Sequence, residues 1–404
     1  VAALNGAGSA WMGGFVVVTT VMIMFYYSVV TGWALKYAIA AGTGLLGRID
    51  PGPFWSDYST SFWQPSLFHI LSIGVAGVIV ARGVTEGIER ASRILIPILF
   101  VLLLCAVGRA VTLPGASAGL AFLFVPDFAA FMNYRTWLEA LTQSAWSTGA
   151  GWGLLLSYAI YVKNTENVVS QAIRIGVGNN LASILAAMAI LPAAFAVLTP
   201  MEARDALSSG NIGLTFVWIP RLFNQMPAGN YLLPVFFVAL FCAALSSLIA
   251  MVELASRALI DRGIARHEAV RLVVLISIVC GLPSAFSLAF FENQDWVWSL
   301  GLMISGMFIA VSAIRFGVQK FRAELVNTHV GGQQAGPWYD WCLLYFVPVQ
   351  FAAMFAWWMY QSVVVYEPGA WWNPFRVLSV GTCVLQWGAV LIGLRVVNRR
   401  LLPS

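Results

Sequence analysis

Long apolar runs, free of Asp, Glu, Lys and Arg, recur along the whole chain. A helix needs roughly 17–25 mainly apolar residues to cross a bilayer, and the runs have about this length. We therefore predict an all-α polytopic membrane protein with about ten spans in a single transmembrane domain, residues 1–404. The predicted spans are Val1–Leu35, Tyr58–Ala81, Ile94–Gly108 with its continuation, Ala140–Val162, Ile175–Met201, Leu232–Val252, Leu272–Phe291, Trp296–Ile314, Trp341–Tyr366 and Val377–Leu394.

One of these runs, Ala140–Val162, carries a pattern that does not fit a continuous helix. Its middle, from Gln143 to Gly153, reads Gln-Ser-Ala-Trp-Ser-Thr-Gly-Ala-Gly-Trp-Gly. An interior glycine costs roughly 1 kcal/mol of helix propensity relative to alanine, and glycine recurs here at alternate positions. Non-helical backbone at membrane depth is tolerated only where protein or a water-filled cavity satisfies its polar groups. The segment therefore predicts a broken helix that lines a solute or ion site.

Composition supports a membrane protein and excludes several other classes. The chain is 60% hydrophobic and 10% charged, whereas soluble domains carry about 25% charged residues. The net charge of +5 does not indicate nucleic-acid binding, because Lys and Arg gather on the cytoplasmic side of membrane proteins. Their distribution, with clusters such as Arg257–Arg271, predicts a cytoplasmic C-terminus. No nucleophile, base and orienting group occur together, so we expect no enzyme.

Four motifs occur in a specific order along the chain. Together they resemble the neurotransmitter:sodium symporter family, and most closely its bacterial amino-acid carriers of the LeuT type. The motifs are Tyr26-Tyr27 followed by Gly32-Trp33, the turn Arg82–Arg90, the broken segment Gln143–Gly153, and the stretch Cys242–Glu253.

The resemblance implies a LeuT-type inverted-repeat fold that begins with the third helix of the family and lacks its first two. Residues 1–125 would be the remainder of the first repeat, 134–320 the second repeat, and 338–400 two C-terminal helices. The implied function is sodium-coupled symport of a neutral amino acid or related small amine, by alternating access, in a bacterial inner membrane. The alternative is a LeuT-fold sensor or partner subunit that does not transport, or an inactive truncated fragment.

Sodium prefers oxygen ligands, including carbonyls freed where a helix unwinds. By resemblance, Ser147 and Asn179 belong to one sodium site, with Asn180 leaving the register open by one residue. Ala243, Ser246 and Ser247 match a second sodium site. The structural alternatives are that the two serines bond back to the preceding turn, and that the asparagine holds helices together.

The same resemblance raises the question of chloride. Gln143, Ser147, Asn179 and Ser183 match positions that line the chloride site of the animal members, and chloride-independent bacterial members usually have a carboxylate where Ser183 stands. Sodium ions in a pocket poor in carboxylates favour a compensating anion. That anion is either chloride or the carboxylate of the substrate.

The remaining site residues also follow from the resemblance. Asp295, Asp261 and Tyr161 match gate positions, although without this match the two aspartates would be interpreted as solvated loop residues. Gly87 and Pro97 match an element that lets a helix unwind. Glu253 is an intramembrane carboxylate, which is by default a functional group with a partner, but the sequence does not name that partner. The expected substrate pocket, which has no charged side chain, comprises Ile23, Tyr27, Trp146, Ser147, Gly149, Trp152, Ser247 and Met251.

Overall fold

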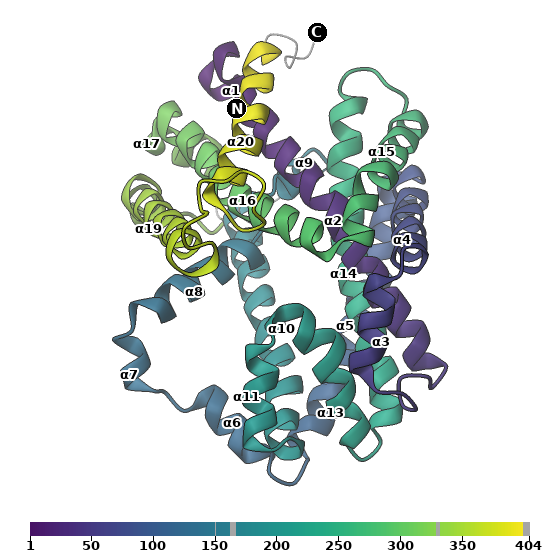
Figure 1. Cartoon of the computed structure of the whole chain (residues 1–404). Helices are drawn as coiled ribbons and strands as arrows, with labels where there is room; N and C mark the ends of the chain where they lie inside the picture. The colour runs from purple at the N-terminus through teal and green to yellow at the C-terminus, as the bar shows by residue number, and fades with distance from the viewer. Residues whose placement is uncertain (150, 162–166, 329–331, 399–404) are drawn as a thin grey trace.

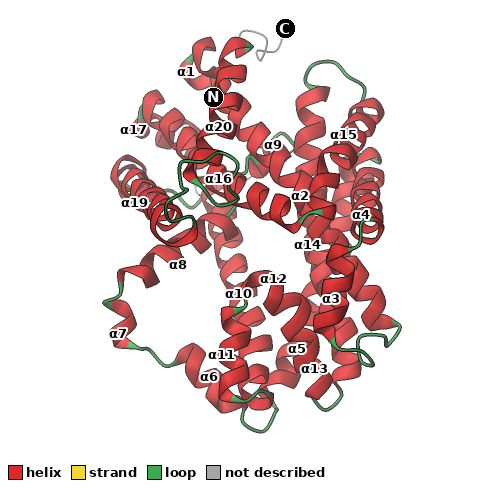
Figure 2. Cartoon of the chain, in the orientation of Figure 1, coloured by secondary structure: helices red, strands yellow, loops and turns green. Residues whose placement is uncertain are grey.

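The computed structural model describes residues 1–149, 151–161, 167–328 and 332–398, and within them it contains helices and loops but no strand (Figure 1, Figure 2). The predicted all-α class is therefore confirmed. The helices are α1 (Ala2–Asn5), α2 (Ala10–Gly42), α3 (Pro51–Thr60), α4 (Trp63–Ala81), α5 (Arg90–Val111), α6 (Ala116–Phe124), α7 (Phe128–Phe131), α8 (Tyr134–Ser147), α9 (Leu154–Ala159), α10 (Val168–Val197), α11 (Pro200–Ser208), α12 (Gly210–Gly213), α13 (Ile219–Gln225), α14 (Gly229–Ile260), α15 (Arg266–Phe286), α16 (Leu288–Phe316), α17 (Val318–Phe321), α18 (Trp338–Trp341), α19 (Val347–Gln361) and α20 (Val380–Val396).

Among the described residues, 8 helical segments are long and apolar enough to cross a membrane. Five of them coincide with single regular helices, and three include π-helical or 3₁₀ turns, as in Trp338–Tyr366. The two other predicted spans are the broken segment, which forms α8 and α9, and the shorter helix α20. Val162, the last residue of the predicted span Ala140–Val162, lies outside the described residues.

Several predicted boundaries are displaced: the span predicted at Leu272–Phe291, for example, runs past the end of α15 at Phe286. The span predicted at Ile175–Met201 is helical from Val168 to Val197. The side chain of Asn167 accepts a hydrogen bond from the backbone N–H of Ser170 at 2.7 Å and so caps the helix earlier than the apolar pattern indicates. Hydropathy identifies the buried length of a span, but local capping decides where the helix begins.

Helix α2 lies at the centre of the packing. It contacts α4, α14, α15 and α16, whereas α5, α6 and α10 form a second group that meets the first through α14. Figure 1 shows α14 running beside α2 and α5. The substrate positions predicted on α2, and the sodium and substrate positions predicted on α14, therefore lie on the two helices that share the most extensive contact.

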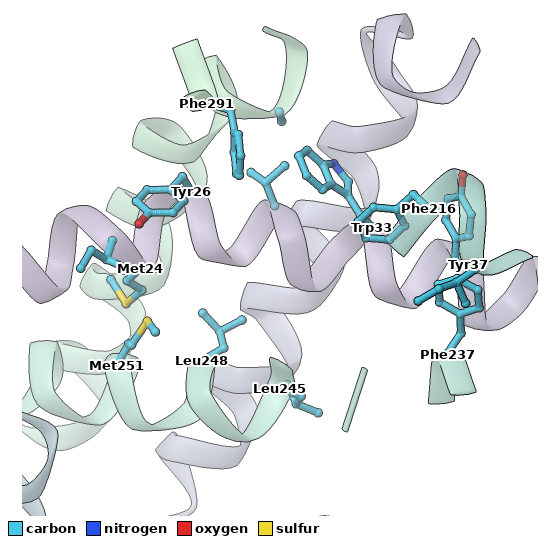
Figure 3. Packing of buried hydrophobic residues seen from close by; sticks show 14 of the residues in the cluster. Met24, Tyr26, Trp33, Tyr37, Phe216, Phe237, Leu245, Leu248, Met251 and Phe291 are labelled. Carbon is cyan, nitrogen blue, oxygen red and sulfur yellow. The ribbon is translucent and has the colours of Figure 1, made fainter. Parts of the chain in front are cut away.

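A cluster of aromatic rings fills the core between α2, α3, α14 and the π-helical segment Leu214–Trp218 that precedes α13 (Figure 3). Trp33 meets Trp55 edge-on at 5.1 Å, and Trp55 stacks on Phe216 at 5.0 Å with an interplanar angle of 10°. Tyr37 packs between Phe216 and Phe237. In lipid, helix association depends on close packing more than on hydrophobic burial, so this interlocked cluster fixes α2 against its neighbours.

A buried histidine joins three helices of the same group. His69 on α4 has its Nδ1 2.9 Å from Ser28 Oγ on α2 and its Nε2 3.2 Å from the carbonyl oxygen of Ile278 on α15. A neutral ring with its proton on Nε2 donates to Ile278 and accepts from Ser28, which satisfies both nitrogens. The ring lies so close to Gly281 that a Cβ there would be 2.4 Å from His69 Cε1. We assign His69 a structural role.

An ion pair at the loop end of the bundle connects two distant segments outside the spans. Arg221 on α13 contacts Asp50, the residue that caps α3, at 3.0 Å. The backbone N–H of Gly52 and the guanidinium of Arg221 hold the pKa of the Asp50 carboxyl below its usual value. Glu202 on α11 has a lowered pKa as well, chiefly because the backbone N–H of Thr199 donates to it.

The close approach of α2 and α4 leads to a first prediction. A Cβ on Gly32 would lie 2.7 Å from the backbone carbon of Phe68 and 2.8 Å from the backbone nitrogen of His69. Gly32→Ala should therefore force the helices apart and destabilise the protein by about 1–3 kcal/mol, measured as a lower melting temperature in detergent. Gly74→Ala on α4 is the control, because no atom lies within 4 Å of the added methyl group. Equal melting temperatures for both variants would contradict this account of the packing.

Candidate functional site

The predicted break in the apolar run is present. Helix α8 ends at Ser147 and α9 begins at Leu154. In the segment between the two helices, the φ values of Gly149, Gly151 and Gly153 are 75°, 84° and 72°. These values lie in the left-handed region, which residues other than glycine rarely adopt. Each of these three glycines therefore interrupts the right-handed helical conformation, and the chain cannot continue as one helix.

Side chains from two other helices satisfy carbonyl groups freed by this break. The hydroxyl of Thr20 on α2 donates to the carbonyl oxygen of Trp152, and the hydroxyl of Ser305 on α16 donates to that of Gly151. Both bonds are buried, which is the condition for irregular backbone at membrane depth. A Cβ on Gly151 would lie 2.5 Å from the carbonyl oxygen of Leu302, so only glycine permits this approach to α16.

On α10, the two neighbouring asparagines have different hydrogen-bond partners. The amide nitrogen of Asn179 donates to Ser147 Oγ at 3.1 Å, whereas that of Asn180 donates to the carbonyl of Gly176 on its own helix. Asn179 is thus the residue that faces the last turn of α8. Ser183, one turn further, donates to the carbonyl of Asn179 at 3.0 Å. Gln143, one turn before Ser147 on α8, is exposed.

The two serines predicted for the second sodium site converge on one carbonyl. Ser246 Oγ and Ser247 Oγ donate to the carbonyl oxygen of Ala243 at 2.8 Å and 3.4 Å. The structure therefore places three oxygen atoms together on one turn of α14. Both bonds run back to the preceding turn of the helix, as the structural alternative to sodium binding expects. The sodium role of Ala243, Ser246 and Ser247 stays a prediction.

The expected substrate pocket is partly assembled around α2, α14 and the break. Tyr27 on α2 interacts through its hydroxyl with Ser247. Ile23 is fully buried on α2, and Met251 is 1% exposed on α14 (Figure 3 shows the latter against Met24).

The two tryptophans of the break lie against each other. The rings of Trp146 and Trp152 meet edge-on at 5.3 Å, while no atom lies within 4 Å of a Cβ built on Gly149. The break therefore combines two bulky indole rings with a position, Gly149, where a side chain would meet no neighbouring atom. Among the predicted pocket residues no side chain is charged, although their role in substrate binding stays a prediction.

The predicted gate residues have protein partners in this structure. On α16, the hydroxyl of Ser299 donates to a carboxylate oxygen of Asp295 at 3.1 Å. Asp261 forms an ion pair at 2.7 Å with Arg257, one turn earlier on the chain. Arg257 also reaches the hydroxyl of Tyr161 at 3.4 Å. Asp261 and Tyr161, predicted at one gate, are therefore linked through a single arginine.

Glu253 has the partner that sequence reasoning did not supply. Its carboxylate is completely buried and accepts from both guanidinium nitrogens of Arg266, at 2.8 Å each, and from Tyr161 Oη at 2.8 Å. Arg266 begins α15, directly after the loop that follows α14. The only sequence signal was a basic residue at a helix start within reach of an intramembrane carboxylate.

The predicted unwinding element lies in a distorted helix. Gly87 belongs to a π-helical turn, Val84–Glu89, and Pro97 lies inside α5. A Cβ on Gly87 would be 2.0 Å from the carbonyl oxygen of Ile79. The glycine is thus required by the contact with α4, and its part in unwinding stays a prediction.

Comparison with known proteins finds similarity to one family of sodium-dependent transporters. A family model described as "Sodium:neurotransmitter symporter family" matches residues 61–401. The chain is 30% identical over 370 residues to the "Uncharacterized sodium-dependent transporter YhdH" of Bacillus subtilis, covering 86% of this chain and 79% of YhdH. It is also 30% identical over 297 residues to the "Uncharacterized sodium-dependent transporter MJ1319" of Methanocaldococcus jannaschii, covering 67% of this chain and 58% of that relative's length.

A solved structure has the same fold. The structure titled "Crystal structure of MhsT in complex with L-phenylalanine" superposes with a TM-score of 0.72 and 26% sequence identity, covering 88% of this chain and 89% of MhsT. The resemblance inferred from the motifs and the predicted LeuT-type fold are therefore confirmed.

The buried ion pair leads to a second prediction. Arg266→Met leaves the Glu253 carboxylate buried with no guanidinium partner, which should destabilise the protein by about 3–5 kcal/mol and lower its melting temperature. The double variant Glu253→Gln with Arg266→Met removes the uncompensated charge, so it should recover much of the loss. Arg271→Met, at an exposed position on α15, is the control and should melt like the wild type. A double variant no more stable than Arg266→Met would refute the argument from charge burial.

Proposed function

The chain belongs to the sodium:neurotransmitter symporter family, a family of transporters and not of enzymes, and from this we propose that it is a sodium-coupled symporter of a neutral amino acid or related small amine. The observation that carries the proposal is the hydrogen bond between Asn179 and Ser147 at the helix break. It brings an amide and a hydroxyl oxygen, both suitable for a hard cation, to the point where two helices meet beside unwound backbone.

The chemistry of the pocket supports a neutral substrate. The predicted lining offers the hydroxyls of Tyr27 and Ser247, the indoles of Trp146 and Trp152, and free space at Gly149, without a fixed charge. A buried, unpaired charge on a substrate would be costly in such a site. A zwitterion fits better, because sodium and the N–H groups at helix starts can face its carboxylate. MhsT, whose crystal structure is a complex with L-phenylalanine, is consistent with this class.

The proposed organisation follows the family fold. Residues 1–125 and 134–320 form parts of two inverted repeats, and 338–400 hold the two C-terminal helices. The protein lies in a bacterial plasma membrane with its C-terminus in the cytoplasm. Asp295 acts at the outer gate, while Asp261 and Tyr161 act at the inner gate with Arg257. Gly87 and Pro97 let α5 unwind, so that sodium leaves from Ala243, Ser246 and Ser247.

A sodium ligand at the break gives the third prediction. In proteoliposomes, tritiated L-phenylalanine should bind in the presence of sodium and not in choline. Ser147→Ala removes one oxygen ligand, and a loss of about 1.4 kcal/mol would raise the half-saturating sodium concentration tenfold. Ser157→Ala is the control, because among the described residues that hydroxyl on α9 bonds to the carbonyl of Gly153 on the preceding turn and to no ion-site residue. Equal binding in sodium and choline would exclude sodium coupling for this probe, and an unchanged sodium requirement in Ser147→Ala would remove the ligand assignment.

We also propose that chloride, or the carboxylate of the substrate, compensates the sodium charge near Gln143, Ser147, Asn179 and Ser183. The fourth prediction separates the two anions. If chloride is used, replacing it by gluconate should weaken sodium-dependent binding of L-phenylalanine, and Ser183→Glu should make binding independent of chloride by supplying a fixed negative charge. Ser183→Gln has a similar size without the charge and should not do so. Wild-type binding that is identical in chloride and gluconate would assign the compensating charge to the substrate.

A further inference from the structure

Residues 332–335, between the π-helical segment Arg322–Val326 and α18, lie against the first turn of α10. The amide nitrogen of Asn167 donates to the carbonyl oxygen of Gln333 at 2.9 Å, and the hydroxyl of Ser170 donates to Gln333 Oε1 at 3.1 Å. The residues joined by these bonds are 166 and 163 positions apart in the chain. We call residues 332–335 the strap, because they connect segments that are remote in the sequence.

The end of the strap nearer to α18 is firmly anchored. The backbone N–H of Ala335 donates to Asn327 Oδ1 at 2.8 Å, and its carbonyl oxygen accepts from Asn327 Nδ2 at 3.0 Å and from Arg322 Nη1 at 3.3 Å. Arg322 also donates through Nε and Nη2 to the two carboxylate oxygens of Asp340, at 2.8 Å and 3.0 Å. Ala335 is buried, and the side chains of Arg322 and Asp340 are 23% and 13% exposed. This bidentate ion pair and the buried backbone bonds form the anchor.

The attachment of the strap to α10, which we call the hook, is weaker than the anchor. It consists of the two bonds from Asn167 and Ser170 to Gln333, which are solvent-exposed and join uncharged groups. Water can replace such bonds, so their net contribution to stability is small. Charge-assisted bonds are roughly twice as strong as neutral ones. The strap therefore detaches at the hook before it detaches at the anchor.

The hook includes the residue that caps α10. Asn167 Oδ1 accepts from the backbone N–H of Ser170 at 2.7 Å, while the amide nitrogen of the same side chain donates to Gln333. A movement of the strap therefore acts directly on the start of the helix. The predicted sodium residue Asn179 lies about 18 Å further along α10, at a rise of 1.5 Å per residue. The hook is thus separate from the proposed ion site.

The strap joins two groups of helices. Helix α10 packs mainly against α5 and α6, whereas the anchor follows α16 and α17 directly in the chain. Helix α16 provides Ser305, which donates to the carbonyl of Gly151 at the break, and α10 provides Asn179, which donates to Ser147. Alternating access requires helix groups to move against each other. A connection between the start of α10 and the end of α16 restrains such a movement.

We propose that the strap is a releasable restraint on α10. While Gln333 is bound to Asn167 and Ser170, the strap holds the start of α10 to the segment that follows α16. When these two bonds break, the first turns of α10 are free to open, and the anchor stays in place. The proposal rests on the proposed function only in that alternating access supplies the movement which the strap restrains. Attachment and release themselves need neither sodium nor substrate.

The fifth prediction concerns hydrogen exchange of the backbone amides in residues 168–176, measured by mass spectrometry on the full chain in lipid nanodiscs without sodium. Asn167→Asp with Ser170→Ala removes both donors to Gln333, while the introduced carboxylate still caps α10. Exchange, which reports local opening, should become about tenfold faster, equivalent to about 1.4 kcal/mol. Ser208→Ala is the control, because that hydroxyl bonds to the carbonyl of Asp205 on its own helix, and it should exchange like the wild type.

A covalent hook tests the release. Ser170→Cys with Gln333→Cys, joined by a short bis-maleimide, cannot detach, so exchange in residues 168–176 should fall at least about threefold below the wild type. The wild type and each single cysteine variant, treated with the same reagent, control for reaction at the native cysteines and should show no slowing. A double variant Asn167→Asp with Ser170→Ala that exchanges like the wild type would overturn the hook. A cross-linked protein that exchanges like the wild type would overturn the release.

The same cross-linked protein connects the strap to transport. Sodium-dependent binding of L-phenylalanine should persist in it while uptake into liposomes stops, because the ion site is distant and only the movement is blocked. Uptake at the wild-type rate would overturn the link between the strap and alternating access. Wild-type protein without sodium-dependent binding would contradict the proposed function instead, and the order of the exchange rates would still decide whether the strap attaches and releases.

Discussion

Carbonyl groups freed from a helix inside a membrane must find hydrogen-bond donors, and the rest of this structure depends on how that requirement is met. The carbonyls of Gly151 and Trp152 accept from Ser305 on α16 and Thr20 on α2. An unsatisfied polar group in hydrocarbon costs several kcal/mol, so the break exists only while α2 and α16 hold these hydroxyls in place. Gly153 adds to the constraint, because a Cβ there would lie 2.8 Å from Val16 and 3.3 Å from Leu254.

This requirement explains why so much of the packing serves to fix α2. The aromatic cluster around Trp33, the close contact of Gly32 with α4 and the bonds of His69 all position that helix. The pair of Glu253 and Arg266 performs a similar task for α14 and α15, and Tyr161 connects it to the chain just after α9. One structural system thus holds the break itself, and the other holds the chain just after α9.

Sequence reasoning succeeded where the signal is local. The alternating glycines predicted the break because left-handed backbone excludes most other residues, and the apolar runs predicted the spans because bilayer thickness fixes their length. It did not identify Thr20 and Ser305 as donors to the break, because these residues lie 132 and 154 positions from the carbonyls that they satisfy. It also left the partner of Glu253 open and the register of Asn179 uncertain by one residue, since both depend on how helices are rotated against each other.

The two interpretations of Ser246 and Ser247 are compatible. A hydroxyl has one proton to donate and two lone pairs, so a serine that donates to the carbonyl of Ala243 keeps both lone pairs for a cation. A bond often taken as evidence against a ligand role is therefore no argument against the predicted role of these two serines. The same reasoning applies to Ser147, whose oxygen accepts from Asn179: one lone pair is used, and its remaining lone pair and the amide oxygen of Asn179 both remain for sodium.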